Sequence, residues 1–356
     1  MGTCMYCRST DGPFHREHVM PQAFGTFEPE SPILRDCVCV QCNNFFGGAL
    51  EMPLSRDSLE AVLRLRYGLK PASEWKDLRY KQLKLKVLEP GPWAGATVIL
   101  EADRTGNGIE PVPVAQAGFC WTGSSTWDWV LEEEMNAERV APYRDAQGKL
   151  GIRVCGPSAT DHKRLIETLA RCGIKFVKQG DLQAPITTDG TVGIQIETEI
   201  DSAIFRAVAK IAFNYVAWAH GSEFVLRSDF DDARHYIRRG KEPLLRVVKP
   251  DKNPILSNDS RHFRQTNGHL VVFDWNYSQR GLLARVSLFN TMTYLVLLCP
   301  DYSGIWRDNL RTGHHFDIES RTVAPIQSTS LIPVVLRASY LAGKQAGLIA
   351  ARRRDG

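Results

Sequence analysis

The segments Cys4-Met-Tyr-Cys7 and Cys39-Val-Gln-Cys42 place two cysteine pairs of identical spacing near the N-terminus of the chain. A Cys-x-x-Cys turn puts two sulfur atoms on one side of a metal ion, and structural zinc takes four ligands in a tetrahedron. One pair would be weak evidence, but two pairs before residue 43 favour a shared site. We therefore predict that these four cysteines bind a structural Zn²⁺ and hold a small domain together. Cys37 is left over, and we expect it to be an inert buried thiol.

Between the two pairs the chain reads Phe14-His-Arg-Glu-His-Val-Met-Pro21, and Asn43 directly follows the second pair. The carboxylate of Glu17 and the side-chain oxygen of Asn43 are the kind of ligand that Mg²⁺ or Mn²⁺ prefers. A neutral His18 beside them can remove a proton from water near pH 7. In the alternative interpretation, Glu17 and His18 only cap or pack against the zinc-bound fold.

In this order the motifs resemble the HNH (His-Me finger) endonucleases, in particular their zinc-bound, endonuclease VII-like branch. The resemblance covers about residues 4–60, and we recognise no family for the rest. It implies a ββα-metal unit, in which a β-hairpin carries Glu17 and His18 and a helix begins near Asn43. It further implies that His18 is the general base, and that Glu17 and Asn43 bind one catalytic Mg²⁺ or Mn²⁺ for phosphodiester hydrolysis.

The chain departs from the family pattern at two positions. Asn43 stands where many HNH enzymes have a histidine, although the endonuclease VII-like branch tolerates asparagine there. The middle asparagine, which orients the catalytic histidine, is missing from the segment Leu34-Arg-Asp-Cys37. Asp36 is a candidate substitute, so the group that orients His18 stays open.

The resemblance implies an HNH unit in residues 1–70, and the hydrophobic pattern predicts a mostly β region in residues 71–200 and an α+β region in residues 201–356. The chain as a whole is therefore expected to be α+β. Capping residues and apolar spacing predict four helices, over Ser55–Tyr67, Asp161–Cys172, Asp201–His220 and Ser228–Arg239, with Ser55 and Ser228 as N-caps. Alternating or apolar runs predict strands over Lys81–Leu88, Ala96–Ala102, Gly118–Thr122, Val192–Ile200, Leu270–Trp275, Leu282–Phe289 and Thr293–Leu298.

The composition is that of an ordinary globular protein, with 43% hydrophobic and 24% charged residues. No apolar run is long enough to span a membrane, and the first residues do not form a signal peptide, so we expect a cytoplasmic protein. The net charge of +4 gives no strong overall attraction to polyanions.

Local groups could nevertheless contact substrate phosphates. The candidates are His15, Arg56, Lys84 and Lys86, although an exposed loop or a solvated face explains them at least as well. Two further groups suggest a second basic surface, for which solvated helix faces are an equal explanation: Arg206, Lys210 and Asn214, and then Arg234, Arg238, Arg239 and Lys241. Glu51 is either an extra metal ligand or a packing or surface residue.

The leading hypothesis is therefore a metal-dependent HNH endonuclease that cuts nucleic acid, with DNA favoured over RNA. The large C-terminal region would serve targeting, regulation or the assembly of a homodimer, which would supply a second active site for the second strand. By association with the family, the function would lie in bacterial phage defence, mobile elements or repair. The alternative is a zinc-bound module or regulator that binds nucleic acid without cutting it.

Overall fold

The computed structural model describes residues 2–29, 31–56, 58–69, 83–88, 93–102, 109–144, 146, 149–177, 180, 194–198, 202–241, 243, 247–251, 255, 268–276, 280–305 and 310–326. It divides the chain into two compact units, one made of residues 1–69 and 200–356 and the other of residues 70–199. The first and third of the three regions expected from the sequence therefore fold together, around one continuous core.

The N-terminal segment contains a short hairpin followed by a helix. Strand β1 (Glu17–His18) pairs antiparallel with β2 (Ile33–Leu34), so that Glu17 lies opposite Leu34. Helix α1 (Val40–Phe46) begins directly after Cys39 and carries Asn43 in its first turns. A π-helical turn (Gly47–Glu51) and helix α2 (Met52–Arg56) continue from it. The hairpin through Glu17 and His18 and the helix near Asn43 are thus both present.

The predicted helix over Ser55–Tyr67 is two helices in the structure, α2 and α3 (Leu59–Arg66). The break is at Ser58, whose hydroxyl accepts the amide N–H of Ala61 (3.2 Å) and donates to the carbonyl of Leu54 (2.5 Å). Ser58 is therefore the capping residue. Ser55, the predicted N-cap, lies inside α2 and donates to the carbonyl of Met52 instead.

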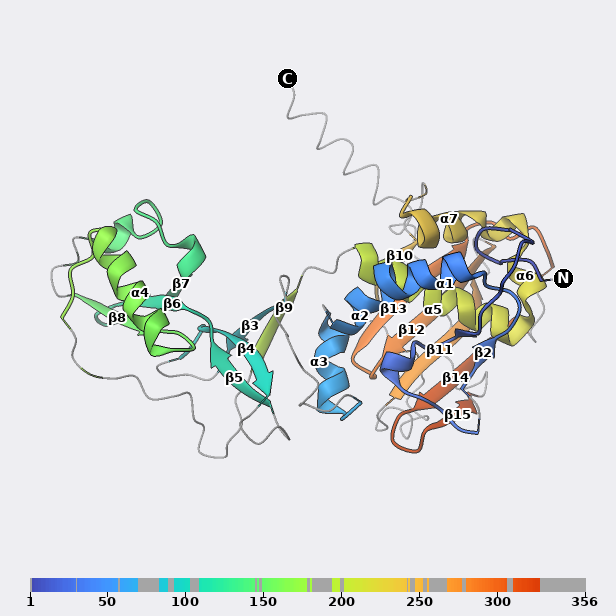
Figure 1. Ribbon diagram of the computed structural model, residues 1–356, viewed down its shortest axis with the longest axis horizontal. Helices are drawn as coiled ribbons and strands as arrows, with labels where there is room; N and C mark the ends of the chain where they lie inside the picture. The colour runs from blue at the N-terminus through green and yellow to red at the C-terminus, as the bar shows by residue number, and fades with distance from the viewer. Residues whose placement is uncertain are drawn as a thin grey trace, which may run out of the picture. The chain divides into compact units, whose positions relative to one another are not determined.

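Helix α5 (Ser202–His220) lies on a six-stranded antiparallel sheet, as Figure 1 shows. The strand order is β10-β13-β12-β11-β14-β15. The strands are β10 (Val248–Pro250), β11 (Gly268–Asn276), β12 (Gly281–Leu288), β13 (Met292–Cys299), β14 (Thr312–Asp317) and β15 (Thr322–Pro325). The predicted strands over Leu270–Trp275, Leu282–Phe289 and Thr293–Leu298 correspond to β11, β12 and β13.

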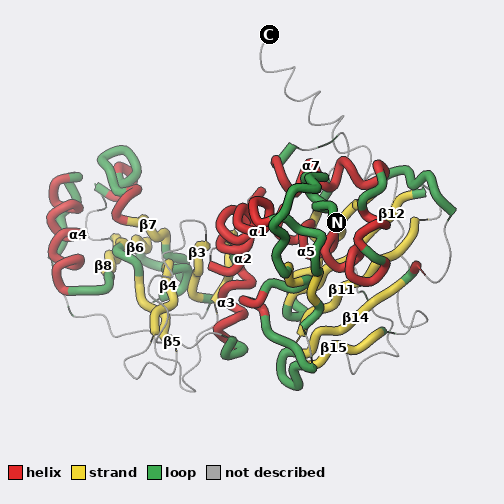
Figure 2. Tube along the Cα trace, turned by 45° about the vertical axis from the view of Figure 1, so that its right-hand side comes forward, coloured by secondary structure: helices red, strands yellow, loops and turns green. Residues whose placement is uncertain are grey.

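Helix α5 is buried on all sides through its middle. Every residue from 207 to 217 is buried, because the helix contacts the sheet and also packs against β2, α2 and the π-helical turn. Figure 2 labels α5 between α2 and the sheet strand β11. A helix in this position cannot leave polar side chains in water, so Lys210 and Asn214 need partners within the protein.

Two further helices follow α5. Helix α6 (Ser222–Val225) is a single turn, and α7 (Asp231–Arg239) is preceded by a 3-10 turn over Ser228–Phe230. The helix predicted from Ser228 therefore becomes α-helical only at Asp231. Gly240 adopts a left-handed conformation (φ 69°) and ends α7 by donating its N–H to the carbonyl of Tyr236, as expected for a C-terminal glycine.

The unit of residues 70–199 contains two antiparallel sheets and one long helix. One sheet has the order β5-β4-β3-β9 and the other β7-β6-β8. The elements are β3 (Leu83–Val87), β4 (Thr97–Ala102), β5 (Ile109–Pro113), β6 (Gln116–Trp121), β7 (Asp128–Leu131), β8 (Leu150–Cys155), α4 (Ala159–Arg171) and β9 (Ile194–Thr198). Within the described residues, no helix has the length and apolar character that a membrane span needs.

Candidate functional site

The four paired cysteines come together where the first turn of the chain meets the start of α1. The sulfur atoms of Cys4, Cys7, Cys39 and Cys42 all lie within 4.8 Å of one another. The Cys4–Cys42 and Cys7–Cys39 sulfur distances are 3.7 and 3.6 Å. A tetrahedron with Zn–S bonds of about 2.3 Å has edges of about 3.8 Å. The four thiols are thus placed to hold one structural metal ion such as zinc.

Two of the neighbouring thiols differ in their acidity. The hydrogen bond between Cys4 and Cys42 lowers the pKa of Cys4 to about 4 and raises the pKa of Cys42, so without a metal it favours the thiolate form of Cys4 alone. The leftover Cys37 is 4% exposed, and burial raises its pKa to about 12. Cys37 is therefore a buried thiol in its protonated form, as the sequence predicts.

The structure brings Glu17 and Asn43 into direct contact. The side-chain amide of Asn43 donates to Oε2 of Glu17 at 3.0 Å and to the carbonyl of Arg16 at 3.2 Å. The contact joins β1 to α1 directly beyond the cysteine cluster, because Asn43 follows Cys42 in the chain. Glu17 itself is only 5% exposed, so its charge depends on partners inside the protein.

The principal partner of Glu17 is Lys210 of α5, which is fully buried. Its ammonium group bonds Oε1 of Glu17 and also Oε1 of Glu51, the latter at 2.7 Å. Burial alone would lower the pKa of Lys210, but the two carboxylates outweigh this effect and raise its pKa above the usual value. Lys210 is therefore charged and lies between two carboxylates.

Asn214, one helical turn after Lys210, completes the network. Its amide N–H groups donate to Oε1 of Glu17 (2.9 Å) and to the backbone carbonyl of His18 (3.1 Å). Its oxygen accepts the hydroxyl of Tyr6 (2.5 Å). Asn214 of helix α5 thus bonds the strand of Glu17 and His18 at two groups, the carboxylate of Glu17 and the backbone carbonyl of His18.

His18 is half-buried at the end of β1. Burial lowers its pKa, and the ammonium of Lys210 acts in the same direction, whereas Glu17 and Glu51 oppose the shift. A lowered pKa leaves the imidazole neutral near pH 7, the form that a general base needs. None of the described residues hydrogen-bonds this ring. Asp36, the candidate for orienting it, is exposed and has a left-handed backbone (φ 56°).

Among the described residues, His15 and Arg56 make no hydrogen bond or ion pair with this network. His15 is exposed in the loop before β1, and Arg56 is exposed at the end of α2. Lys84 and Lys86 are on β3 in the other unit, where Lys86 is half-buried; the side chain of Lys84 is outside the described residues. Glu51 is placed beside Glu17 through Lys210, which makes it part of the same cluster.

Lys210 and Asn214 were missed as site residues because the sequence suggested a basic surface around them. The available signal was their spacing: two polar residues one turn apart in the middle of an otherwise apolar helix. A polar side chain that such a helix buries needs a hydrogen-bond partner within the protein. Arg206, the third member of the predicted stripe, donates to the carbonyls of Ile237 and Arg238.

The chemical types of Glu17, Glu51 and Asn43 suit a divalent cation, but their arrangement here does not. Both carboxylate oxygens of Glu17 accept hydrogen bonds, and the ammonium of Lys210 lies where it would repel a second cation. A divalent ion fits this donor set only after Lys210 withdraws. That Glu17 and Asn43 bind Mg²⁺ or Mn²⁺ stays a prediction from the sequence.

No family model, curated protein or solved structure matches this chain. Its function must be inferred from the residues themselves.

Proposed function

We propose that this protein is an HNH-type endonuclease that hydrolyses phosphodiester bonds of nucleic acid, with DNA favoured over RNA and His18 as the general base. One observation carries the proposal: a hairpin and helix hold Glu17, His18 and Asn43 together beside a four-cysteine cluster. The preference for DNA, and a function in phage defence, mobile elements or repair, come only from the family resemblance.

In this reaction the neutral imidazole of His18 takes a proton from water. The water oxygen then forms a bond to phosphorus while the bond from phosphorus to the 3′ oxygen breaks. The 3′ oxygen leaves with the bonding electron pair and takes up a proton from solvent. Burial supports this function, because it lowers the pKa of His18 and keeps the ring unprotonated at neutral pH. We assign no step to a divalent cation, since the arrangement of Glu17 and Lys210 offers it no free position.

The buried network would position His18 through the backbone carbonyl of this residue. Asn214 bonds the carbonyl of His18 and the carboxylate of Glu17, so the strand that carries the imidazole is held in place. This support replaces, at least for the backbone, the side-chain asparagine that the family uses to orient the histidine. Asn214 is in this proposal a positioning residue.

The test is a cleavage assay with the zinc-loaded full-length protein. Supercoiled plasmid, single-stranded DNA, branched DNA and RNA would each be incubated with Mg²⁺, with Mn²⁺, and without added divalent ions. His18→Ala is expected to keep its zinc and its nucleic-acid binding but to cleave at least about 10²-fold more slowly. His162→Ala, a change at an exposed histidine of α4, is the control and should cleave like the wild type.

One specific observation favours a second function: both carboxylate oxygens of Glu17 already accept hydrogen bonds, from Lys210, Asn43 and Asn214. A carboxylate with no free oxygen is what a purely structural residue would show, as in a zinc-bound module that binds nucleic acid without cutting it. Binding of nucleic acid with no cleavage under any of these ion conditions would establish this alternative. Near wild-type cleavage by His18→Ala would remove His18 from the mechanism.

A further inference from the structure

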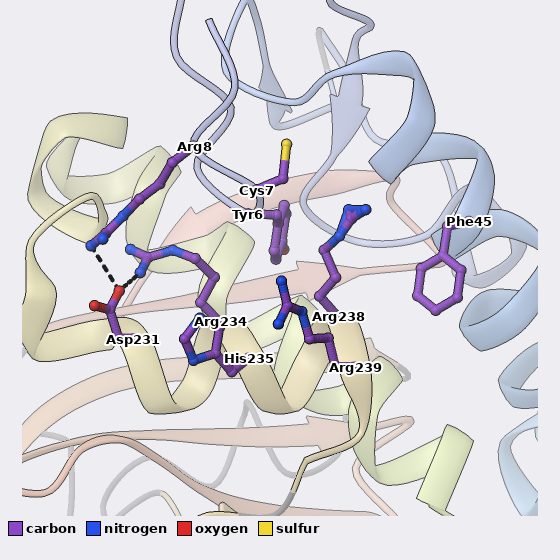
Figure 3. Close-up of a pocket in the computed structure, with 9 residues that line it drawn as sticks. All are labelled: Tyr6, Cys7, Arg8, Phe45, Asp231, Arg234, His235, Arg238 and Arg239. Atoms are coloured by element: carbon purple, nitrogen blue, oxygen red, sulfur yellow. Dashed lines mark hydrogen bonds and ion pairs between the residues drawn. The ribbon is translucent and has the colours of Figure 1, made fainter.

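A second candidate site lies between the first cysteine turn and helix α7. A cavity of about 290 Å³ is bounded by Tyr6, Cys7 and Arg8 of this turn, by Phe45 of α1, and by one face of α7 (Figure 3). Its basic residues are Arg8, Arg234, His235, Arg238 and Arg239, and among the described residues that line it Asp231 is the only acidic one. The cavity lies within the unit of residues 1–69 and 200–356.

Part of this positive charge is used by the fold. Asp231 accepts hydrogen bonds from both Arg8 (2.7 Å) and Arg234, so one carboxylate serves two guanidinium groups. Arg234 is buried and also donates to the carbonyls of Met5 (2.7 Å) and Val225 (2.6 Å). Arg234 therefore joins the first cysteine turn to α6 and α7, and it is not available to a ligand.

Arg238 has a different partner. Its guanidinium contacts the sulfur of Cys42 at 2.7 Å. A zinc ion with four thiolates carries a net charge of −2, and a cation beside one sulfur reduces this charge. Arg238 is thus placed as a counter-charge of the metal centre.

Arg239 and His235 remain. Both are exposed at the cavity, and neither has a hydrogen bond or an ion pair with any described residue. Figure 3 shows the two side chains on α7, on the same side as Arg238 and with the ring of Phe45 beyond. A guanidinium presents several N–H donors in a plane, which suits two oxygens of one phosphate.

We propose that this cavity binds a backbone phosphate of a nucleic-acid strand, with Arg239 as the main contact and His235 beside it. The proposal rests on the proposed function for the nature of the ligand, since a free nucleotide carries the same phosphate chemistry. The ring of Phe45, 37% exposed, gives the cavity an apolar wall against which a base can stack. The substrate strand would then be held by α7 in addition to its contact with His18.

The competing explanation is that the arginines only neutralise the metal centre. Arg239 separates the two explanations, because it lines the cavity without contacting a cysteine. Its variants can therefore change ligand binding while they leave the zinc centre intact.

The experiment measures fluorescence anisotropy of a labelled single-stranded DNA with the zinc-loaded full-length protein. All variants carry His18→Ala, so that no strand is cut. Arg239→Glu is expected to weaken binding at least about 10-fold and to reduce the slope of log K against log salt by about 0.7. Arg239→Lys should retain most of the affinity. Arg171→Glu, a matched change at an exposed arginine of α4, should bind like its parent, and zinc content should be equal in all.

Three outcomes would overturn the proposal. An unchanged Kd in Arg239→Glu would leave the arginines as counter-charges of the metal centre. An equal loss in Arg171→Glu would point to general surface charge. Competition by deoxyadenosine monophosphate or inorganic phosphate at micromolar concentration would assign the cavity to a free ligand, whereas competition only at millimolar concentration supports a strand. Cleavage is assayed separately with proteins that retain His18. Failure of the cavity proposal appears as unchanged binding by Arg239→Glu, whereas failure of the proposed nuclease function appears as absence of cleavage by the wild type.

Discussion

The ammonium group of Lys210 bonds the carboxylate of Glu17, although the two residues are 193 positions apart in the sequence. Lys210 is fully buried and Glu17 is 5% exposed, so neither charge is stabilised by water. The pair persists because Glu51, Asn43 and Asn214 satisfy the remaining donors and acceptors. The contact attaches the candidate catalytic hairpin to the central helix of the larger unit.

Replacing Lys210 should destabilise the protein strongly. Lys210→Met leaves the two carboxylates of Glu17 and Glu51 close together without their shared cation. Breaking a buried pair in this way costs about 3–5 kcal/mol. Urea-induced unfolding followed by tryptophan fluorescence measures the loss. Lys163→Met, at an exposed position of α4, is the control and should unfold like the wild type. Equal midpoints for both variants would show that the Lys210 pair is not formed in solution.

The same substitution should create a better site for a divalent ion. If the ammonium of Lys210 competes with a metal for Glu17 and Glu51, Lys210→Met should bind Mn²⁺ more tightly than the wild type. Manganese should also raise its melting temperature, because a ligand that binds only the native state stabilises it. Electron paramagnetic resonance of free Mn²⁺ gives the affinity. Adding Glu51→Gln should reverse the gain, and an affinity equal to that of the wild type would show that the two cations do not compete.

Removing one cysteine of the cluster should remove the metal. The wild type is expected to contain about one equivalent of zinc, and Cys39→Ser should lose it and aggregate, because metal binding supplies folding energy in small zinc units. Cys37→Ser is the matched control: it changes a buried thiol outside the cluster and should keep the zinc. Wild-type protein free of zinc by metal analysis would refute the assignment.

The sequence predicts well those features that depend on neighbours in the chain. The cysteine pairs come together as their spacing indicates. Helix α5 begins within a residue of its predicted start and ends at His220, because its apolar repeat and Gly221 are local signals. The misplaced cap Ser55 is also instructive: Ser55 and Ser58 are both chemically suitable, and only the observed break between α2 and α3 distinguishes them.

Contacts between distant segments are what the sequence could not reveal. Lys210 and Asn214 look like a solvated stripe until α5 is known to be buried by the N-terminal segment on one side and the sheet on the other. The same cause explains the domain boundaries. The limits near residues 70 and 200 are visible as changes of pattern, but only tertiary packing shows that the chain returns to its first unit after residue 199.

This shared core makes the N-terminal segment dependent on the C-terminal one. Tyr6 packs on Phe213 of α5, with ring centroids 5.2 Å apart, and Glu17 needs Lys210. A fragment of residues 1–69 should therefore fail to fold even with zinc, as judged by a poorly dispersed NMR spectrum. The fragment 71–356, which contains the region expected to assemble a homodimer, lacks the N-terminal partner of α5 and should be unstable.

A matched chain that joins residues 1–69 to 200–356 by a flexible Gly-Ser linker should restore the fold. It is expected to bind one zinc and to show a dispersed spectrum, because it contains the whole unit. If the isolated fragment 1–69 folds with zinc by itself, the N-terminal segment is an independent domain and the dependence on α5 is absent. Light scattering of the joined chain and of the full-length protein also tests the predicted homodimer.

The stability of the larger unit should decrease in acid because of His269 on β11. This residue is fully buried: its Nδ1 accepts the N–H of Phe289 (3.1 Å), so Nε2 carries the proton and donates to the carbonyl of Phe24 (2.9 Å). Burial lowers its pKa from 6.5 to about 4. Between these values the unfolded chain binds a proton that the native protein does not, so the free energy of unfolding falls as the pH decreases from 6.5 to 4. The full loss is about 3 kcal/mol.

His269→Gln isolates this contribution, because glutamine keeps a donor and an acceptor but does not titrate. Its unfolding free energy is expected to be lower than that of the wild type at pH 7, and the difference should shrink as the pH decreases towards 4. His220 and His314 also have pKa values lowered by burial, and zinc is lost in acid, but both effects are common to the two proteins. Urea midpoints at pH 7, 6, 5 and 4 provide the comparison. If the urea midpoints of the two proteins changed with pH in the same way, His269 would have the same pKa in the native and unfolded states. Either its pKa is not lowered in the native protein, or it is equally low in the unfolded chain. The hydrogen bond from the N–H of Phe289 to Nδ1 requires this nitrogen to be unprotonated, which argues against the first case. The ordinary pKa of an exposed histidine argues against the second case.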